Sequence, residues 1–75
     1  MEQKNQQTVS STNEIGRIIR KKRKSMGMTQ AQAAAHGGVG VRFLSEVENG
    51  KLRAEIGKVL QVMNKLGIEI TISYS

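Results

Sequence analysis

Positively charged side chains are the densest set of chemically active groups in this sequence of 75 residues. Six of the 12 Lys and Arg side chains lie within eight consecutive positions: Arg17, Arg20, Lys21, Lys22, Arg23 and Lys24. Such a run forms either a solvated helix face or a surface that contacts phosphates, and the spacing does not distinguish the two. The formal net charge of +6 favours a nucleic-acid partner, followed by an acidic protein or an anionic membrane surface.

Groups able to perform catalysis or hold a metal ion are scarce. The chain has no Cys and no Asp, and His36 is its one histidine. Disulfides and thiol chemistry are therefore excluded, and a zinc site would lack further ligands. A general base would have to be His36 alone, and there is no nucleophile–base pair. We expect no enzyme activity, no cofactor and no metal, and we interpret His36 as a polar residue at a helix end that interacts with the helix dipole.

The segment 29–51 has the pattern of two short helices joined by a glycine turn. Thr29 and Gln32 form a Thr-x-x-Gln capping box, and a run of alanines follows. Gly37-Gly38 ends this helix, since only glycine adopts the left-handed backbone without steric cost. A second helix is predicted from about Val41 to Glu48, closed by Asn49-Gly50. The alanines leave little side-chain bulk on the first helix, so the two helices can cross closely. This arrangement is typical of a helix-turn-helix, which binds DNA.

The same residues resemble the Cro/XRE, or lambda-repressor-like, helix-turn-helix domains. The resemblance covers roughly residues 15–72 and rests on several spaced positions, which are Ile19-Arg20, Arg23, Gly27, Thr29-Gln30, Ala34, Gly38-Val39, Leu44, Val47 and Glu48-Asn49-Gly50-Lys51. It implies a mainly α, four-helix DNA-binding domain. Gly40 departs from the family pattern, because a polar N-cap usually begins the second, recognition helix there.

The resemblance also implies roles for individual residues. Arg23 and Glu48 are expected to form an ion pair that ties the first helix to the third. The expected DNA-binding residues are Thr29, Gln30, Gly40, Val41, Arg42, Phe43, Ser45, Glu46, Asn49 and Lys51. Among them Arg42 suits guanine, and Val41 or Phe43 suits a thymine methyl. Alternatives stay open for three of these residues. Phe43 could instead belong to the core, Glu46 could be solvated, and Arg42 could contact a phosphate.

The remaining elements follow from periodicity. Residues 1–12 are polar and predict a flexible N-terminal tail, which leaves 13–67 as the helix-turn-helix domain. A first helix is predicted from Thr12 or Asn13 to about Met26, with Ile15, Ile18, Ile19 and Met26 buried. A fourth is predicted from about Ala54 to Gly67, with a buried stripe of Ile56, Val59, Leu60, Met63 and Leu66, and with Val62 outside that stripe.

Residues 68–75 change to the period of a β-strand. Ile68, Ile70, Ile72 and Tyr74 alternate with polar residues, and no other segment of the chain alternates in this way. A lone strand leaves its backbone groups unpaired, so the partner must come from a second molecule. The simplest partner is the same strand of a second copy, and we therefore predict a homodimer whose interface contains these four side chains. A short terminal strand of this kind resembles the HipB-like antitoxins, including the y4mF-type regulators.

We therefore interpret the chain as a sequence-specific repressor. Its predicted partners are double-stranded DNA with an inverted-repeat operator, a second copy of itself and a HipA-like kinase toxin, as the resemblance implies. The predicted location is cytoplasmic and nucleoid-associated, with no membrane partner. One alternative is a stand-alone, phage-type or restriction-controller XRE regulator. Another is a basic module that binds a protein or membrane surface, although the first helix lacks the Trp or Phe anchors of an interfacial helix.

Overall fold

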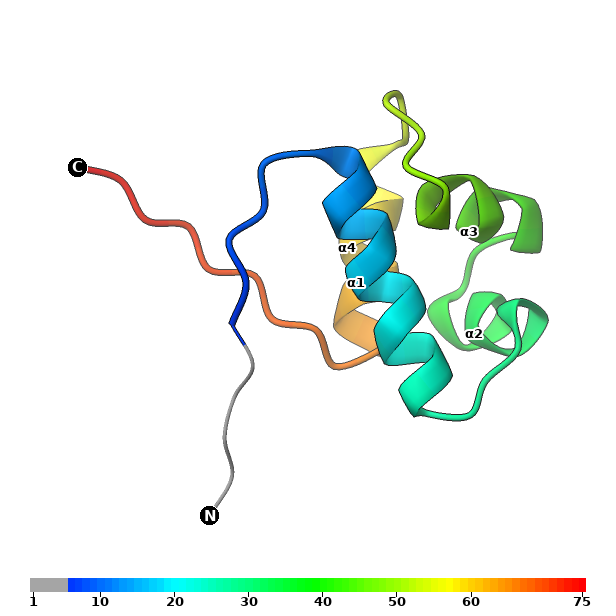
Figure 1. Ribbon diagram of the computed structural model, residues 1–75. Helices are drawn as coiled ribbons and strands as arrows, with labels where there is room; N and C mark the ends of the chain where they lie inside the picture. Colours follow the sequence, from blue (N-terminus) through cyan, green and yellow to red (C-terminus); the bar gives the residue numbers. More distant parts are fainter. Residues whose placement is uncertain (1–5) are drawn as a thin grey trace, which may run out of the picture.

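The computed structural model describes residues 6–75 and contains four helices (Figure 1). They are α1 (Thr12–Ser25), α2 (Gln30–Gly37), α3 (Val41–Glu48) and α4 (Ile56–Lys65). α1 packs against α3, and α2 packs against both α3 and α4. This arrangement confirms the predicted four-helix, mainly α fold. Within residues 6–75, none of the helices combines the length and the apolar character needed to span a bilayer.

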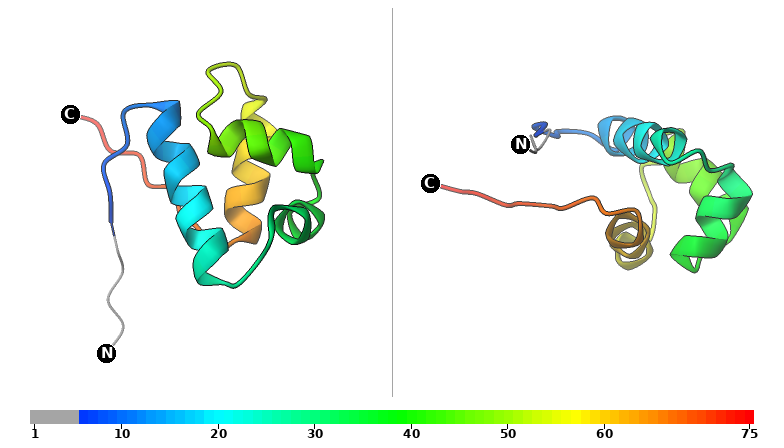
Figure 2. Two further views of the ribbon diagram at one scale, coloured as in Figure 1. Left: turned by 45° about the vertical axis from the view of Figure 1, so that its right-hand side comes forward. Right: turned by 90° about the horizontal axis from the view of Figure 1, so that it is seen from below.

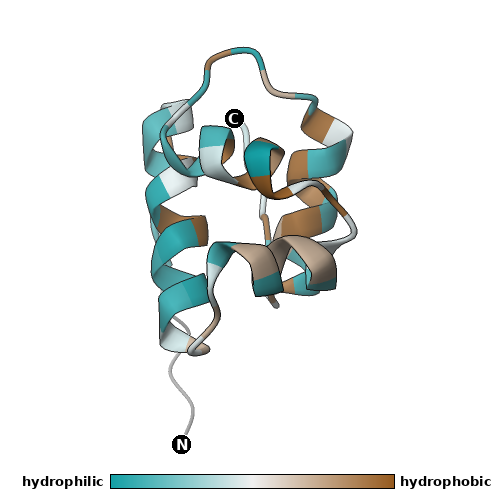
Figure 3. Cartoon of the chain, turned by 90° about the vertical axis from the view of Figure 1, so that its right-hand side faces the viewer, coloured by the Kyte–Doolittle hydropathy of each residue, from teal (hydrophilic) through white to brown (hydrophobic). Residues whose placement is uncertain are grey.

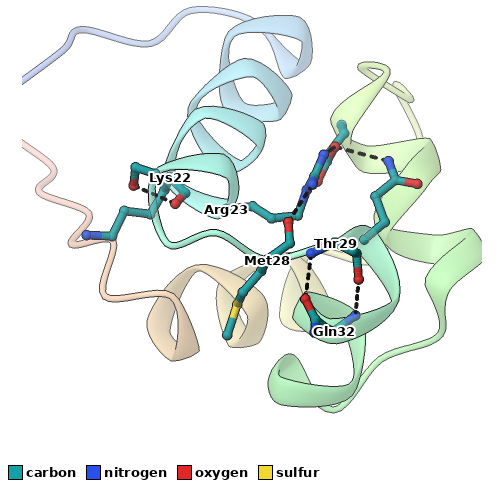
Figure 4. Close-up of polar contacts among 8 residues, drawn as sticks. Lys22, Arg23, Met28, Thr29 and Gln32 are labelled. Carbon is teal, nitrogen blue, oxygen red and sulfur yellow. Dashed lines mark hydrogen bonds and ion pairs between the residues drawn. The ribbon is translucent and has the colours of Figure 1, made fainter.

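The ends of α2 are set by local sequence, as predicted. The backbone N–H of Gln32 donates to Thr29 Oγ1 at 3.1 Å, and the backbone N–H of Thr29 donates to Gln32 Oε1 at 2.9 Å, which completes the capping box (Figure 4). Gly38 closes the helix with φ of +73°. The predicted bounds of α3 are also confirmed, and Gly50 follows it with φ of +82°.

The core lies between the helices and is small. Its fully buried large side chains are Ile19, Leu44, Val62 and Leu66. α2 contributes Ala33 and Ala34, which are short enough to let it approach its neighbours closely. Gly37 extends this contact, since a Cβ at that position would lie 3.2 Å from Val62 Cγ2. In Figure 3, α1 is mostly hydrophilic in colour, whereas α4 carries several hydrophobic bands.

The predicted apolar face of α4 was partly wrong. Val62, which was placed outside the stripe, is 1% exposed, whereas Ile56 is 64% exposed and Leu60 is 44% exposed. The cause is that α2 covers the side of α4 that carries Val62, so the other side of a broad apolar stripe faces solvent. The helix also begins at Ile56, two residues after the predicted Ala54, with Glu55 as its N-cap.

Both ends of α1 also differ from the prediction. Met26 is 43% exposed and does not join the buried stripe, because the helix ends at Ser25. At the other end Ser11 is the N-cap, and its side chain accepts from the backbone N–H of Glu14. Thr12 Oγ1 donates to the backbone carbonyl of Gly50 at 3.0 Å. The end of the predicted tail therefore belongs to the helix cap, and the first five tail residues lie outside the described residues.

Residues 68–75 form no strand in the single chain. The backbone N–H of Ile68 donates to the Met63 carbonyl at 2.8 Å, and Ile68 packs against the core. The rest of the segment runs away from the helices (Figure 2), so that Ile72 and Tyr74 are 84% and 94% exposed. The predicted strand pairing requires a second copy and remains a proposal.

Candidate nucleic-acid interface

The beginning of α3 is open to solvent and has no side-chain cap. Gly40 is its N-cap with φ of −74° and ψ of 150°, and a Cβ there would meet nothing within 4 Å. The first amides of a helix have no intrahelical acceptor and carry the positive end of the helix dipole. The uncapped start of α3 thus presents free donors and a partial positive charge, which suit an anionic or hydrogen-bonding partner.

An outward stripe runs along α3 from this open end. Arg42, Glu46 and Asn49 are spaced four and three residues apart, so they share one face of the helix. Arg42 and Asn49 are exposed, and Val41, which precedes Arg42 at the start of the helix, is 49% exposed. An arginine followed by two further polar side chains at this spacing can present donors and acceptors along a groove. We call Arg42, Glu46 and Asn49 the α3 stripe.

Two residues of the expected set lie partly inside the protein. Phe43 is half-buried and packs against the core, and Lys58 Nζ lies 5.8 Å from the centre of its ring. Ser45 is half-buried as well. Phe43 therefore has a structural role in joining α3 to α4, which favours Val41 over Phe43 as an apolar contact for a ligand.

A buried ion pair fixes α3 relative to α1. Arg23 Nε donates to Glu48 Oε2 at 2.7 Å, and an Nη of Arg23 donates to Glu48 Oε1 at 3.0 Å. The side chains are 9% and 2% exposed. The other Nη of Arg23 donates to the Met28 carbonyl at 2.8 Å (Figure 4). The pair inferred from the resemblance is therefore present, and it also holds the link between α1 and α2.

Gln30 joins the same network from the start of α2. Its Nε2 donates to Glu48 Oε1 at 3.1 Å. The first amides of α2, at Gln30 and Ala31, have no intrahelical acceptor and lie at the positive end of its dipole. Glu48 thus ties the N-terminus of α2 to the last turn of α3. A helix N-terminus held in this way suits a phosphate.

The network makes the charge of Glu48 depend on folding. Burial raises the pKa of Glu48, but hydrogen bonds from Arg23 and Gln30 outweigh it, so the pKa lies below its usual range. The Glu48 carboxylate therefore binds a proton more tightly in the unfolded chain than in the folded chain. The stabilisation is complete above the unfolded pKa of about 4.3 and is lost as the pH falls through the folded value.

We therefore expect acid to destabilise the wild type through Glu48. Urea unfolding between about pH 3 and pH 6 should show stability that rises with pH at the acid end and levels off above the unfolded pKa of about 4.3, because only below that pH does the unfolded state hold a Glu48 proton that the folded state has released. Glu48→Gln should reduce that slope, since glutamine keeps the shape but does not titrate. Equal slopes in the two proteins would mean that Glu48 is not the responsible group.

The loop after α3 places a second cation near the α3 stripe. Lys51 Nζ lies 3.3 Å from Glu46 Oε2, and the two side chains are 47% and 39% exposed. The backbone N–H of Lys51 also donates to the Glu46 carbonyl at 3.1 Å. The loop therefore holds Lys51 beside Asn49, at the end of α3 opposite to Gly40.

Three positions that support this geometry were missed by the sequence analysis or interpreted differently. Gly16 lies where α1 meets the end of α3, and a Cβ there would collide with the carbonyls of Val47 and Glu48. A glycine inside a helical pattern was the available signal. Gln61 Nε2 donates to the Gly37 carbonyl at 2.8 Å. His36 Nε2 lies 2.9 Å from the Lys65 carbonyl and therefore links α2 to α4.

Comparison with known proteins identifies the family. Residues 19–72 match the helix-turn-helix family. The chain is 46% identical over 59 residues to the HTH-type transcriptional regulator y4mF of Sinorhizobium fredii (strain NBRC 101917 / NGR234), and the match covers 79% of this chain and 78% of that protein. A transcriptional regulator of this type belongs to a non-enzymatic class of proteins.

Solved structures share the fold. The HipA-HipB-O2-O3 complex contains a chain with a TM-score of 0.81 and 19% identity, covering 92% of this chain and 97% of that chain. A HipB variant in an O2 20mer complex has a TM-score of 0.83 and 20% identity, covering 95% and 99%. The HipB structures therefore share the fold of α1 to α4, and the family match over residues 19–72, together with the 46% identical relative, shows that the chain belongs to the Cro/XRE-type helix-turn-helix family of DNA-binding transcriptional regulators.

Proposed function

We propose that this regulator is a HipB-like antitoxin, which represses its own operon as a homodimer and binds a HipA-like kinase toxin. The observation that carries the DNA-binding part is the α3 stripe with its uncapped helix start, fixed to α1 and α2 by the Arg23–Glu48 pair. The HipB structures support the antitoxin part, since one of them is a complex with HipA.

The contacts to DNA divide into those that position and those that read sequence. The start of α2, beside Thr29, directs the free amides of Gln30 and Ala31 at one phosphate, and Asn49 and Lys51 contact a second stretch of backbone. α3 then enters the major groove with Gly40 leading. Arg42 donates to guanine O6 and N7, and Val41 meets a thymine methyl.

Replacing Arg42 and Lys51 separately should distinguish the two kinds of contact. Arg42→Ala is expected to weaken binding to the cognate site about tenfold or more while changing binding to random duplex much less, because a bidentate base contact carries sequence information. Lys51→Ala should weaken both alike and reduce the dependence of affinity on salt. Fluorescence anisotropy at several salt concentrations measures both. Equal losses on both duplexes for Arg42→Ala would assign it to a phosphate.

The dimer is proposed from apolar groups that a single chain leaves exposed. Ile70 is 50% exposed, and Ile72 and Tyr74 are more so. On α4, the exposed Leu60 lines a shallow hollow with Ile68 and Ile70 of the terminal segment, and Ile56 is exposed at the start of the helix. Pairing residues 68–75 of two copies would satisfy the backbone and cover Ile68, Ile70, Ile72 and Tyr74. Two copies related by a two-fold axis place their α3 helices about 34 Å apart, which selects an inverted repeat.

The strand can be tested with one proline. Thr71→Pro removes a backbone donor and is incompatible with a paired strand. We expect the variant to shift toward monomer, to unfold at a lower temperature and to bind the operator more weakly, because two linked half-sites gain from effective concentration. Sedimentation measures the first effect. A variant that still sediments as a dimer at micromolar concentration would move the interface to the exposed side of α4.

A second candidate function is a stand-alone XRE regulator without a toxin. Its support is the relative y4mF, whose name gives transcriptional regulation, the activity that both candidate functions share. Co-expression with the product of the neighbouring gene, followed by purification on a tag carried by the regulator, separates the two functions. A HipA-like kinase that co-purifies in stoichiometric amount supports the antitoxin. A regulator that binds its operator but retains no such protein supports the stand-alone function.

A further inference from the structure

The surface proposed to meet DNA carries a negative charge. Within residues 6–75, Glu46 is the one carboxylate on the α3 stripe, one helical turn after Arg42. Glu48, two residues later, is buried against Arg23 and does not face the partner. A carboxylate near phosphates is repelled by them, so it weakens binding unless it gains a hydrogen bond from the partner. At this surface Glu46 therefore either lowers the affinity for DNA or accepts a specific hydrogen bond from it.

In the protein without DNA, Lys51 forms an ion pair with Glu46. The Nζ–Oε2 distance is 3.3 Å, and the backbone of Lys51 is also bonded to the Glu46 carbonyl. Arg42, although spaced four residues before Glu46, makes no ion pair among the described residues. Lys51 thus neutralises Glu46 from the loop side, and the guanidinium of Arg42 keeps its donors available.

The chemistry of base edges limits what Glu46 can accept from. An ionised carboxylate only accepts hydrogen bonds. In the major groove, cytosine presents its N4 amino group as a donor, whereas guanine presents N7 and O6 as acceptors and thymine presents O4. Adenine places an acceptor, N7, beside its amino donor. Cytosine is therefore the base that a carboxylate fits best, and guanine and thymine oppose it.

We propose that Glu46 is a specificity-determining residue, which accepts a hydrogen bond from cytosine N4 in the major groove and weakens binding to sites that lack cytosine there. The inference rests on the proposed DNA-binding face. It adds a cytosine to the guanine read by Arg42, one helical turn away. It also gives the Glu46–Lys51 pair a function, because Lys51 keeps the carboxylate neutralised until Lys51 itself contacts a phosphate.

The experiment is selection from a randomised duplex library by wild type and by Glu46→Gln. Wild type should enrich a cytosine at one position in each half-site, and changing that C·G pair to T·A should weaken binding about tenfold. Glutamine suits adenine N6 and N7, so Glu46→Gln should replace the cytosine preference by adenine. It should also bind random duplex more tightly than wild type, because one negative charge is gone.

Glu55→Gln is the matched control. Glu55 pairs with Lys58 at 3.4 Å, is at least as exposed as Glu46, and lies at the start of α4 instead of on the α3 stripe. The Glu55→Gln substitution changes the net charge by the same amount as Glu46→Gln and should leave every base preference unchanged. If Glu46→Gln enriches the same base at each position as wild type, the inference is overturned while the repressor remains. If wild type enriches no sequence, the proposed function and this inference fail together.

Discussion

Replacing Arg23 with alanine is expected to lower the free energy of unfolding by about 3–5 kcal/mol. The reason is that Glu48 would remain buried, with its side chain 2% exposed, after losing both guanidinium hydrogen bonds. The Met28 carbonyl would lose its donor as well. In a domain of 75 residues this loss removes much of the total stability. Urea unfolding followed by circular dichroism measures it.

The double-mutant cycle separates the pair from its surroundings. Glu48→Ala should also destabilise strongly, because it leaves Arg23 buried and Gln30 without its acceptor. The loss of unfolding free energy in the double variant should be smaller than the sum of the losses in the two single variants. In the double variant no buried charge remains without its partner. Lys24→Ala is the control, because Lys24 is an exposed neighbour on the same helix. Additive losses would mean that Arg23 and Glu48 do not interact in solution.

Replacing Gly16 with alanine is the second substitution expected to have a large effect. The new Cβ would lie 2.8 Å from the backbone carbonyl oxygen of Glu48 and closer still to that of Val47. Backbone atoms cannot rotate away as a side chain can, so α1 and α3 would have to separate. We expect a loss of about 3 kcal/mol, the upper part of the range for overpacking, which exceeds the gain of about 1 kcal/mol from the helix propensity of alanine.

Gly57→Ala provides the matched control for Gly16. It is the same substitution in α4, but a Cβ at Gly57 would meet nothing within 4 Å. The helix propensity of alanine should therefore raise stability by about 0.5–1 kcal/mol. Thermal unfolding of both variants gives the comparison. If Gly16→Ala raises the midpoint as Gly57→Ala is expected to do, the close approach of α1 to α3 does not exist in solution.

Features that are determined by residues close together in the sequence could be predicted, whereas features that depend on the packing of distant elements could not. The bounds of α2 follow from Thr29, Gln32 and Gly38, which act within a few residues, and they were predicted correctly. The buried face of α4 was not, because Val62 and Leu60 are both apolar and only the position of α2 decides which of them is covered. Local sequence alone could not select between them.

The same distinction holds at the candidate site. The Arg23–Glu48 pair was inferred from a family resemblance and is present in the structure, while the bond from Gln30 to Glu48 joins residues 18 apart and had no sequence signal. The contact of Glu46 with Lys51 depends on the fold of the loop after α3, so only the structure reveals it. Residues 68–75 carry a clear alternating pattern, but they form no strand in the single chain, and the second copy proposed as their partner lies outside it.

Hydroxyl-radical footprinting of the full chain on the promoter of its own gene tests most directly whether the protein is a sequence-specific repressor. We expect two protected half-sites in inverted orientation, with centres about 10 base pairs apart or a multiple of that spacing. Protection should disappear with Arg42→Ala at concentrations that saturate the wild type. Retardation of the promoter fragment without any localised protection, equal to that of random duplex, would contradict a sequence-specific repressor.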